Sequence, residues 1–598
     1  MNPCLVIFNQ YMRFFNLFRC HFFNHFLLRN RSIRITSNSR QTIPHICSNK
    51  IGSRKSSTDF IIPPNTRLST RMTFHRRSKI PFKSSNIVLL NPKTHCIHNS
   101  NEFLSISISR SSGWHQFFHS FMKFSSFHQI SSIFNFCENY RWNKQNYKKI
   151  SKHIKILIFI IPFLISANKT YSIELPKPLT SNDFHKVDME KVKIGRLLFH
   201  DKILSANRNI ACATCHSHDL GGSDGLSLGI GEGGHGIGIE RTAGSGDDKI
   251  KKRVPRNALA LWNLGFKDIT TLLHDGRVTK SDIFGNGFNT PAQELLPKGL
   301  DNIVAVQALF PMTRQFEMAG NPGENEIIGL VSKVGKDSMR IDRVWPVITH
   351  RIRGVPEYVE MFKHAFDDVD NALDINITHI VNSIAAFEIH EWTSFDSPFD
   401  EYLNGNKSAL NSNQIAGMNL FYGKANCSSC HSGSLLSDQK FHSIGIPQFG
   451  PGRTRPFDPY ARDVGRMVET DDVNDMYKFK TPALRNVSLT APYGHNGAYP
   501  TLKGIIKHHL NPVAMNKNWK PQYANLPKAP WLEQIDFVTF SDKKEQDRII
   551  SSIEIKPIDL SEKEIDQLVS FLKSLTGKSE NQRPLGKPEK VPSGLTID

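Results

Sequence analysis

The sequence contains Cys212-Ala-Thr-Cys215-His216, and the same spacing returns in Cys427-Ser-Ser-Cys430-His431. Two cysteines three positions apart, followed directly by a histidine, are the pattern of covalent haem attachment. Both thiols reach the vinyl groups of one haem while the adjacent imidazole binds its iron. A zinc site would need four ligands from both copies, and a redox Cys-x-x-Cys would need a βαβ context, and neither explains the two histidines. The spacing predicts two haem c groups, one on each motif; residues 212–216 and 427–431 are called the first and second haem motif.

The remaining cysteines and the basic charge belong to the N-terminal part of the chain. Of the net charge of +20, residues 1–150 carry 22 Lys and Arg against three acidic residues, which leaves 53 basic against 52 acidic residues in the rest. The remainder is therefore nearly neutral, and the charge gives no support for a nucleic-acid partner. No cysteine after residue 150 is left for a disulfide. The other five cysteines have no repeated spacing and are Cys4, Cys20, Cys47, Cys96 and Cys137.

Two segments precede the first folded-looking sequence. Residues 1–147 lack helical or strand periodicity and contain almost no acid, so we expect no fold there. Residues 148–172 combine a basic stretch, an apolar run and small or polar residues, which are the parts of a signal peptide. The apolar run is too short to span a bilayer comfortably. We therefore expect a periplasmic protein whose true start lies downstream, with residues 1–147 as a leader; an uncleaved membrane anchor and an organellar transit peptide are the alternatives.

The rest of the chain is typical of a mainly α protein with long loops. Apolar spacing predicts a helix over 187–199 before the first motif and a short one over 415–421 before the second. The stretch 347–403 indicates helices and connectors, and few segments alternate as strands do. Ser561-Glu-Lys-Glu564 is a capping box that opens a last helix, stopped by Gly577. We expect two cytochrome c-like domains with one haem each, over 173–400 and 401–598.

Several further stretches resemble the bacterial diheme cytochrome c peroxidases and their MauG relatives. The resemblance keeps its order from about residue 185 to 577. It implies that the haem on His216 reacts with hydrogen peroxide and that the haem on His431 takes electrons from a small donor protein, a cytochrome c or a cupredoxin. The matching stretches are Ile194–Ser205, Leu220–Gly225, Arg256–Ala258, His274–Arg277, Lys480–Val487 and Thr490–Gly497.

The resemblance also implies catalytic residues. In the family a Gln and a Glu ten residues apart stand on the distal side of the peroxidatic haem, and Gln307 and Glu317 have this spacing. Splitting the O–O bond needs a group that takes a proton from one oxygen and returns it to the other. Glu317 is our candidate for that role.

Three positions depart from the family pattern. Where many peroxidases have a loop histidine that caps the first iron at rest, this chain has Glu232, with His235 three residues later as an alternative ligand. The distal ligand of the second haem, Met in peroxidases and Tyr in MauG, falls on His509, with His508 and Met515 as neighbouring competitors. His274 stands where a Trp usually lies between the haems, and Trp262 is a candidate substitute.

A calcium ion is implied as well. The family binds it between its domains through an Asn side chain and the carbonyl groups of a Thr and a Pro, and Asn263, Thr490 and Pro492 occupy these places. Oxygen ligands of this kind suit calcium. A homodimer is common in the families that this one resembles.

Two rival functions remain at this level. A MauG-like enzyme would oxidise Trp or Tyr residues of a partner protein, and the non-Met ligand and the missing loop histidine favour it. A non-catalytic diheme electron carrier would have no use for Glu317. We expect the peroxidase.

Overall fold

The computed structural model describes residues 174–246, 249–327, 340–454, 462–578 and 584–598. The predictions for the leader 1–147 and the signal peptide 148–172 therefore lie outside the described residues. All the described residues belong to one compact unit. Among the described residues, no helix is both long enough and apolar enough to cross a membrane.

The described chain is mainly α, as predicted. The strands are two or three residues long and form a three-stranded antiparallel sheet and a two-stranded one. They are β1 Thr271–Leu272, β2 Val278–Lys280, β3 Phe288–Asn289, β4 Phe441–His442 and β5 Phe479–Lys480. The helices are α5 Met189–His200, α6 Cys212–Cys215, α7 Ile303–Ala308, α9 Val344–Arg353, α10 Pro356–Ala365, α11 Ile377–Glu391, α12 Pro398–Leu403, α13 Ser412–Tyr422, α14 Met467–Thr470, α15 Leu502–Leu510, α16 Pro512–Lys517, α17 Pro530–Asp536, α18 Val538–Ser541, α19 Lys543–Ser551 and α20 Glu562–Lys573.

Helix capping explains where the three expected helices begin. Asp188 caps α5, so this helix begins two residues later than the apolar pattern alone indicates. Asn411 and Gln414 form a capping box, and α13 accordingly begins at Ser412 rather than Ile415. Ser561 caps α20 as predicted.

Each haem motif is preceded by a helix that crosses another helix at a glycine. A Cβ atom on Gly195 of α5 would lie 1.8 Å from the carbonyl oxygen of Ser383 on α11. A Cβ atom on Gly417 of α13 would lie 1.9 Å from the carbonyl oxygen of Gln567 on α20. Backbones this close leave no room for a side chain. Each of the two helix crossings therefore requires a glycine, and each crossing positions the haem motif that follows it.

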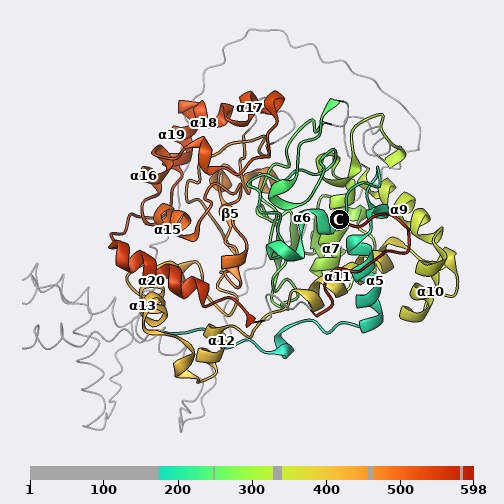
Figure 1. Ribbon diagram of the computed structural model, residues 1–598, viewed down its shortest axis with the longest axis horizontal. Coiled ribbons are helices and arrows are strands. Elements are labelled where there is room, and N and C mark those ends of the chain that lie inside the picture. The colour runs from blue at the N-terminus through green and yellow to red at the C-terminus, as the bar shows by residue number, and fades with distance from the viewer. Residues whose placement is uncertain (1–173, 247–248, 328–339, 455–461, 579–583) are drawn as a thin grey trace, which may run out of the picture. The chain divides into compact units, whose positions relative to one another are not determined.

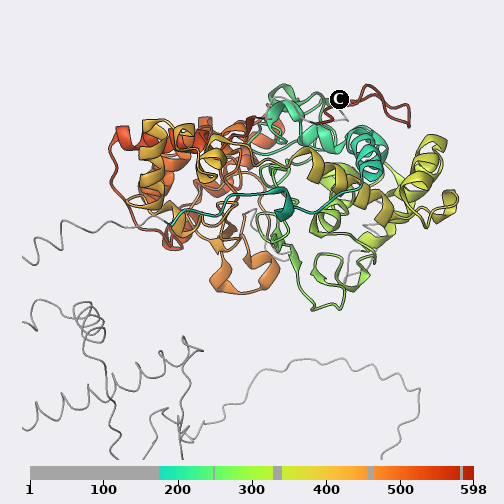
Figure 2. The same cartoon turned by 90° about the horizontal axis from the view of Figure 1, so that it is seen from below.

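Apolar side chains gather in two main cores. The first is built almost entirely from residues 179–392, and the second from residues 399–575 with Leu228. Figures 1 and 2 show the corresponding helices as two neighbouring groups, α5 to α11 on one side and α13 to α20 on the other. The boundary near residue 400 separates these cores; that each core is a separate domain with its own haem stays a prediction.

The C-terminal segment 584–598 returns from the second group of helices to the first (Figure 1). Arg196 of α5 donates to the carbonyl oxygens of Gly586 and Lys587, at 2.8 and 2.9 Å. At the far end of the segment, the Asp598 carboxylate pairs with Lys202 at 2.5 Å and accepts a hydrogen bond from the hydroxyl of Thr214. Thr214 stands between the two cysteines of the first motif, so this segment supports the motif from outside.

Candidate functional site: a cavity shared by two haem motifs

Both haem motifs open into one continuous cavity of about 1130 Å³. This volume exceeds the range of roughly 300–1,000 Å³ that is usual for a single small-molecule site. All four motif cysteines and both motif histidines line it. The space and its lining therefore suit more than one large prosthetic group.

Three histidines around the cavity have the same hydrogen-bond arrangement. The Nδ1 atom of His216 lies 3.0 Å from the carbonyl oxygen of Gly222, and that of His431 lies 3.1 Å from the carbonyl oxygen of Leu436. His509 Nδ1 lies 2.8 Å from the carbonyl oxygen of Ile505. A carbonyl can only accept, so Nδ1 carries the proton and Nε2 keeps the lone pair that binds a metal.

At the second motif the imidazoles of two histidines, His431 and His509, lie close together. The ring centres of His431 and His509 lie 6.3 Å apart. That span equals two metal–nitrogen bonds of about 2 Å each plus two ring radii, so the pair fits an iron held between two imidazoles. Both residues line the cavity.

The two competitors for this ligand position have other surroundings. His508 is fully buried, and its Nδ1 and Nε2 atoms both lie 2.7 Å from partners, the Tyr499 hydroxyl and the carbonyl oxygen of Ile444. Met515 packs against the second core and is not among the residues that line the cavity. The geometry favours His509 over both.

The first motif is arranged differently. Among the described residues, no histidine ring lies as near to His216 as His509 lies to His431. Gln307 and Glu317 instead line the same cavity. Burial lowers the pKa of His216, and nearby Glu317 acts in the opposite direction, which shows that the carboxylate lies within electrostatic range of this imidazole.

Short helical turns position these two polar side chains. Gln307 is on α7, which is capped by the Asn302 side chain. Glu317 lies in a single π-helical turn, Gln315–Ala319, and is half-buried, with Arg314 Nε 3.8 Å from its carboxylate. Isolated π-helical turns are often found at functional sites.

The loop that carries Glu232 and His235 does not bring either side chain into the cavity. Glu232 is buried and accepts hydrogen bonds from the Nδ2 atoms of Asn207 and Asn209, at 2.7 and 2.6 Å. His235 is exposed and pairs through its backbone with Thr242. Neither residue lines the cavity, so ligation by His235 stays a prediction that this geometry does not favour.

Contacts that sequence reasoning missed fasten this loop. The buried Arg241 side chain donates to the carbonyl oxygens of Ile230, Gly231 and Gly236 at 2.6 to 2.8 Å. A Cβ atom on Gly231 would lie 2.2 Å from the carbonyl oxygen of Phe316. The loop therefore packs directly on the turn that presents Glu317. These contacts could not be predicted from the sequence, because the glycines Gly231 and Gly236 and the single Arg241 form no periodic pattern.

The expected calcium ligands also line the cavity, but the Asn263 amide is already engaged. Its Oδ1 accepts from the Ser394 N–H at 2.7 Å, and its Nδ2 donates to the Ser394 carbonyl at 2.8 Å. An amide oxygen has a second lone pair, so Asn263, Thr490 and Pro492 remain a predicted set, and no step of the chemistry depends on it.

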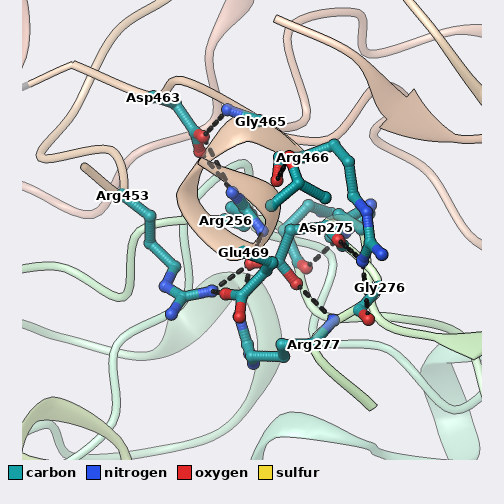
Figure 3. A network of polar contacts seen from close by, with 12 residues as sticks. Arg256, Asp275, Gly276, Arg277, Arg453, Asp463, Gly465, Arg466 and Glu469 are labelled. Atoms are coloured by element: carbon teal, nitrogen blue, oxygen red, sulfur yellow. Dashed lines mark hydrogen bonds and ion pairs between the residues drawn. The ribbon is translucent and has the colours of Figure 1, made fainter. Parts of the chain in front are cut away.

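A buried network of charges lies beside the cavity (Figure 3). Arg256 binds Asp463 through two hydrogen bonds of 2.7 and 2.8 Å, and its third nitrogen lies 2.6 Å from Asp275. Arg277 and Arg453 also contact Asp275. Burial alone would raise the pKa of Asp275, but the three arginines hold it well below its ordinary value.

His274, the residue at the expected Trp position, is adjacent to this network. Its Nε2 lies 3.2 Å from the carbonyl oxygen of Asn257, and it lines the cavity together with Trp262. Burial, reinforced by the charge of Arg256, lowers the pKa of His274 to about 4. The imidazole is therefore neutral at neutral pH.

The zinc alternative finds no support in the described residues. Among them, the group of metal-binding side chains close enough to share an ion is Cys430, Asp438 and His442, which draws on one motif alone. Burial raises the pKa of Cys212, Cys215 and Cys427 to about 12.

Two buried carboxyl groups in the cavity were not predicted. Glu388 of α11 and Asp224 line it near the first motif, and both are almost fully buried. One oxygen of each has no hydrogen-bond partner among the described residues. Buried carboxyl groups are rare enough that each calls for a functional explanation.

The cavity, the two motifs and the three ligand-type imidazoles define the architecture of a di-haem c-type cytochrome. A family model described as di-haem cytochrome c peroxidase matches residues 189–408. Over that range the chain is similar to this family of haem oxidoreductases, and the match implies two haem c groups as cofactors.

Curated relatives carry both names that the resemblance implied. The methylamine utilization protein MauG of Methylorubrum extorquens is 27% identical over 388 residues, which are 64% of this chain and 78% of that protein. MauG of Methylophilus methylotrophus is 27% identical over 398 residues, 64% of this chain and 93% of that protein. The cytochrome c peroxidase Ccp of Escherichia coli is 30% identical over 321 residues, 54% of this chain and 53% of that protein.

Proposed function

We propose that this protein reduces hydrogen peroxide to water with electrons from a small donor protein, a cytochrome c or a cupredoxin. The observation that carries the proposal is the contrast between the motifs. The imidazole ring of His509 lies 6.3 Å from that of His431, whereas the carboxylate of Glu317 acts on His216. A site that only carries electrons needs two axial ligands and no proton-transfer group.

The chain's own residues supply the proton chemistry. Reduction of hydrogen peroxide to two water molecules takes up two electrons and two protons. The Glu317 carboxylate accepts the proton from one peroxide oxygen and returns it to the departing one. The Gln307 amide orients the substrate, and Arg314 restrains the Glu317 carboxylate from 3.8 Å. When bound, the haems supply the single-electron redox chemistry, held by His216 at the first motif and by His431 and His509 at the second.

Glu317→Gln tests the proposal. The amide has the shape of the carboxyl group but cannot take up a proton, so turnover of reduced donor cytochrome should fall roughly 10²- to 10⁴-fold. Haem content, measured from the absorbance of the denatured protein, should not change. The matched control is Glu324→Gln, because Glu324 is exposed on the same segment and outside the cavity lining. Full turnover in the Glu317 variant would contradict the role assigned to Glu317, and a lack of turnover in the unchanged protein would instead support a diheme electron carrier.

The second candidate is MauG-like oxidation of Trp or Tyr residues of a partner protein. Two observations favour it: His509 stands where peroxidases have Met, and neither Glu232 nor His235 lines the cavity. Titrating the fully oxidised protein with peroxide, and then assaying reduced cytochrome c, separates the two functions. Rapid reaction without prior reduction and without cytochrome turnover would overturn the peroxidase in favour of this candidate.

We also propose export to the periplasm, one cytochrome c-like domain per haem, a calcium ion on Asn263, Thr490 and Pro492, and a homodimer. The signal-like composition of residues 148–172 supports export, and the two apolar cores support the domain division.

Three of these proposals have a direct test. N-terminal sequencing of the purified protein tests export, metal analysis tests the calcium ion, and sedimentation tests the homodimer. A mature chain that begins before Lys148, or a calcium-free protein, would contradict the respective proposal.

A further inference from the structure

Glu388 is an almost fully buried carboxyl group with no part in the proton transfer assigned to Glu317. It lies near the end of α11, is 5% exposed, and lines the cavity at the first haem motif. Its Oε2 atom is buried without a hydrogen-bond partner among the described residues. A carboxyl group in this setting is costly when charged and must gain or lose its proton with any change of charge beside it.

The titratable group that interacts electrostatically with Glu388 is Cys212, one of the cysteines to which the first haem attaches. Burial and the neighbouring Glu388 both raise the pKa of Cys212. A thioether bond to haem removes that thiol, so Glu388 is left as an ionisable group beside Cys212. Burial also raises the pKa of Glu388 itself, to about 8. Its ionisation therefore falls near neutral pH, where a change in neighbouring charge has the largest effect on proton uptake.

The ionised groups on the helices packed against α11 are engaged elsewhere, and burial is what raises the pKa of Glu388. On α5, Lys191 pairs with Asp301, Lys193 pairs with Glu190, and Arg196 donates to the carbonyl oxygens of Gly586 and Lys587. The helix α7, Ile303–Ala308, has no titratable side chain. On α5, burial lowers the pKa of His200 to about 4, so it is neutral, and its ring lies against Phe387 and His218. Among the charged residues of α9, Arg351 and Arg353 are bonded to backbone carbonyl oxygens elsewhere.

We propose that Glu388 takes up a proton when the haem of the first motif takes up an electron. Oxidised haem carries one more positive charge than reduced haem, and this charge favours the carboxylate. A haem held at the first motif would lose one positive charge on accepting one electron from the donor protein, and the Glu388 carboxylate would then bind one proton from solvent and become neutral. The inference rests on the proposed function only in taking the first haem as the site that electrons reach.

The test is the midpoint potential of the first haem, followed by absorbance between pH 6 and 9 in the holoprotein. In the unchanged protein each pH unit should change the reduction equilibrium up to tenfold, about 59 mV for one electron, with the potential falling as pH rises. Glu388→Gln should abolish this slope, because an amide cannot titrate. Glu388→Asp should keep a slope at a shifted pH. The haem of the second motif, in the same molecule, should stay unaffected.

Two controls separate this role from a structural one. Glu357→Gln, at an exposed position on α10, should leave the slope unchanged. Asp224→Asn removes the other buried carboxyl group of the cavity, whose pKa burial raises to about 7. A slope that persists in Glu388→Gln, or that disappears in Asp224→Asn alone, would overturn the proposal. Neither peroxide nor donor protein enters the measurement, so a failed peroxidase assay has no bearing on it.

Discussion

His508 and His509 are neighbours on α15 with opposite surroundings. Consecutive residues on a helix point about 100° apart, so one imidazole meets Tyr499 and Ile444 in the core while the other meets the cavity and His431. A second imidazole is a stronger donor than a thioether and stabilises oxidised iron. The second haem should therefore have a lower potential than one with a Met ligand.

His509→Met should raise the potential of the second haem by on the order of 0.1 V, within the roughly 0.8 V that axial ligands span. A potentiometric titration followed by absorbance measures it. Met515→Leu is the control and should change nothing, because Met515 packs against the core. A shift in the Met515 variant, with none in the His509 variant, would assign the ligand to Met515.

The residues of the haem motifs could be predicted because their chemistry fixes a local spacing. Cys212, Cys215 and His216 need no tertiary information. His509 was the predicted ligand, but His508 and Met515 stayed as competitors, because the choice depends on which face of α15 meets the cavity. Glu388 was missed since a glutamate within an apolar helix has no local mark of its role.

Among the elements, the two helix crossings depend most directly on single positions. Gly195 and Gly417 each allow backbone contact where any side chain would collide with a carbonyl oxygen. The flanking helices hold the haem motifs, so loosening a crossing should affect haem binding as well as stability. Because both crossings have the same geometry, a substitution of either glycine should have a similar effect.

Gly417→Ala should lower the free energy of unfolding by about 1–3 kcal/mol, the usual cost of overpacking, as measured by denaturant titration of the holoprotein. Gly504→Ala is the matched control within α15, since its Cβ atom would meet nothing closer than the Thr501 hydroxyl at 3.2 Å. That change should alter stability by less than about 1 kcal/mol. Equal effects of the two substitutions would show that the crossing does not depend on Gly417.

Helix positions could be predicted well where capping and apolar spacing agree, as at Ser561 in α20. The crossings could not, because Gly195 and Gly417 look like weak points in a helical pattern until the partner helix is known. The turn that holds Glu317 was equally hidden, since a π-helical turn has no sequence period of its own. Capping residues and apolar spacing in the sequence predict where helices form, whereas the way the helices cross depends on tertiary packing.

At the scale of the whole molecule, buried charges connect the two groups of helices. Arg256 precedes the first apolar core's small sheet, whereas Asp463 lies far along the chain beside the second core, and they share two hydrogen bonds (Figure 3). The segment 584–598 makes a second connection, from Asp598 to Lys202 and Thr214. Residues so far apart in the sequence form no local pattern from which these contacts could be predicted.

Asp463→Asn should destabilise the holoprotein by about 3–5 kcal/mol at pH 7, because it leaves the buried Arg256 without one of its charge partners. Burial would raise the pKa of Asp463, but Arg256 lowers it below the ordinary value. A carboxyl group with a lowered pKa stabilises the fold above its unfolded pKa, and this stabilisation is lost as pH falls through the folded one. The difference in unfolding free energy between the unchanged protein and the variant should therefore be constant between pH 5 and 8 and should shrink below about pH 4.

The control is Asp547→Asn, in an exposed pair with Lys543, which should cost less than about 1 kcal/mol at any pH. An equal, pH-independent loss in both variants would show that the Arg256–Asp463 contact does not hold the two groups of helices together.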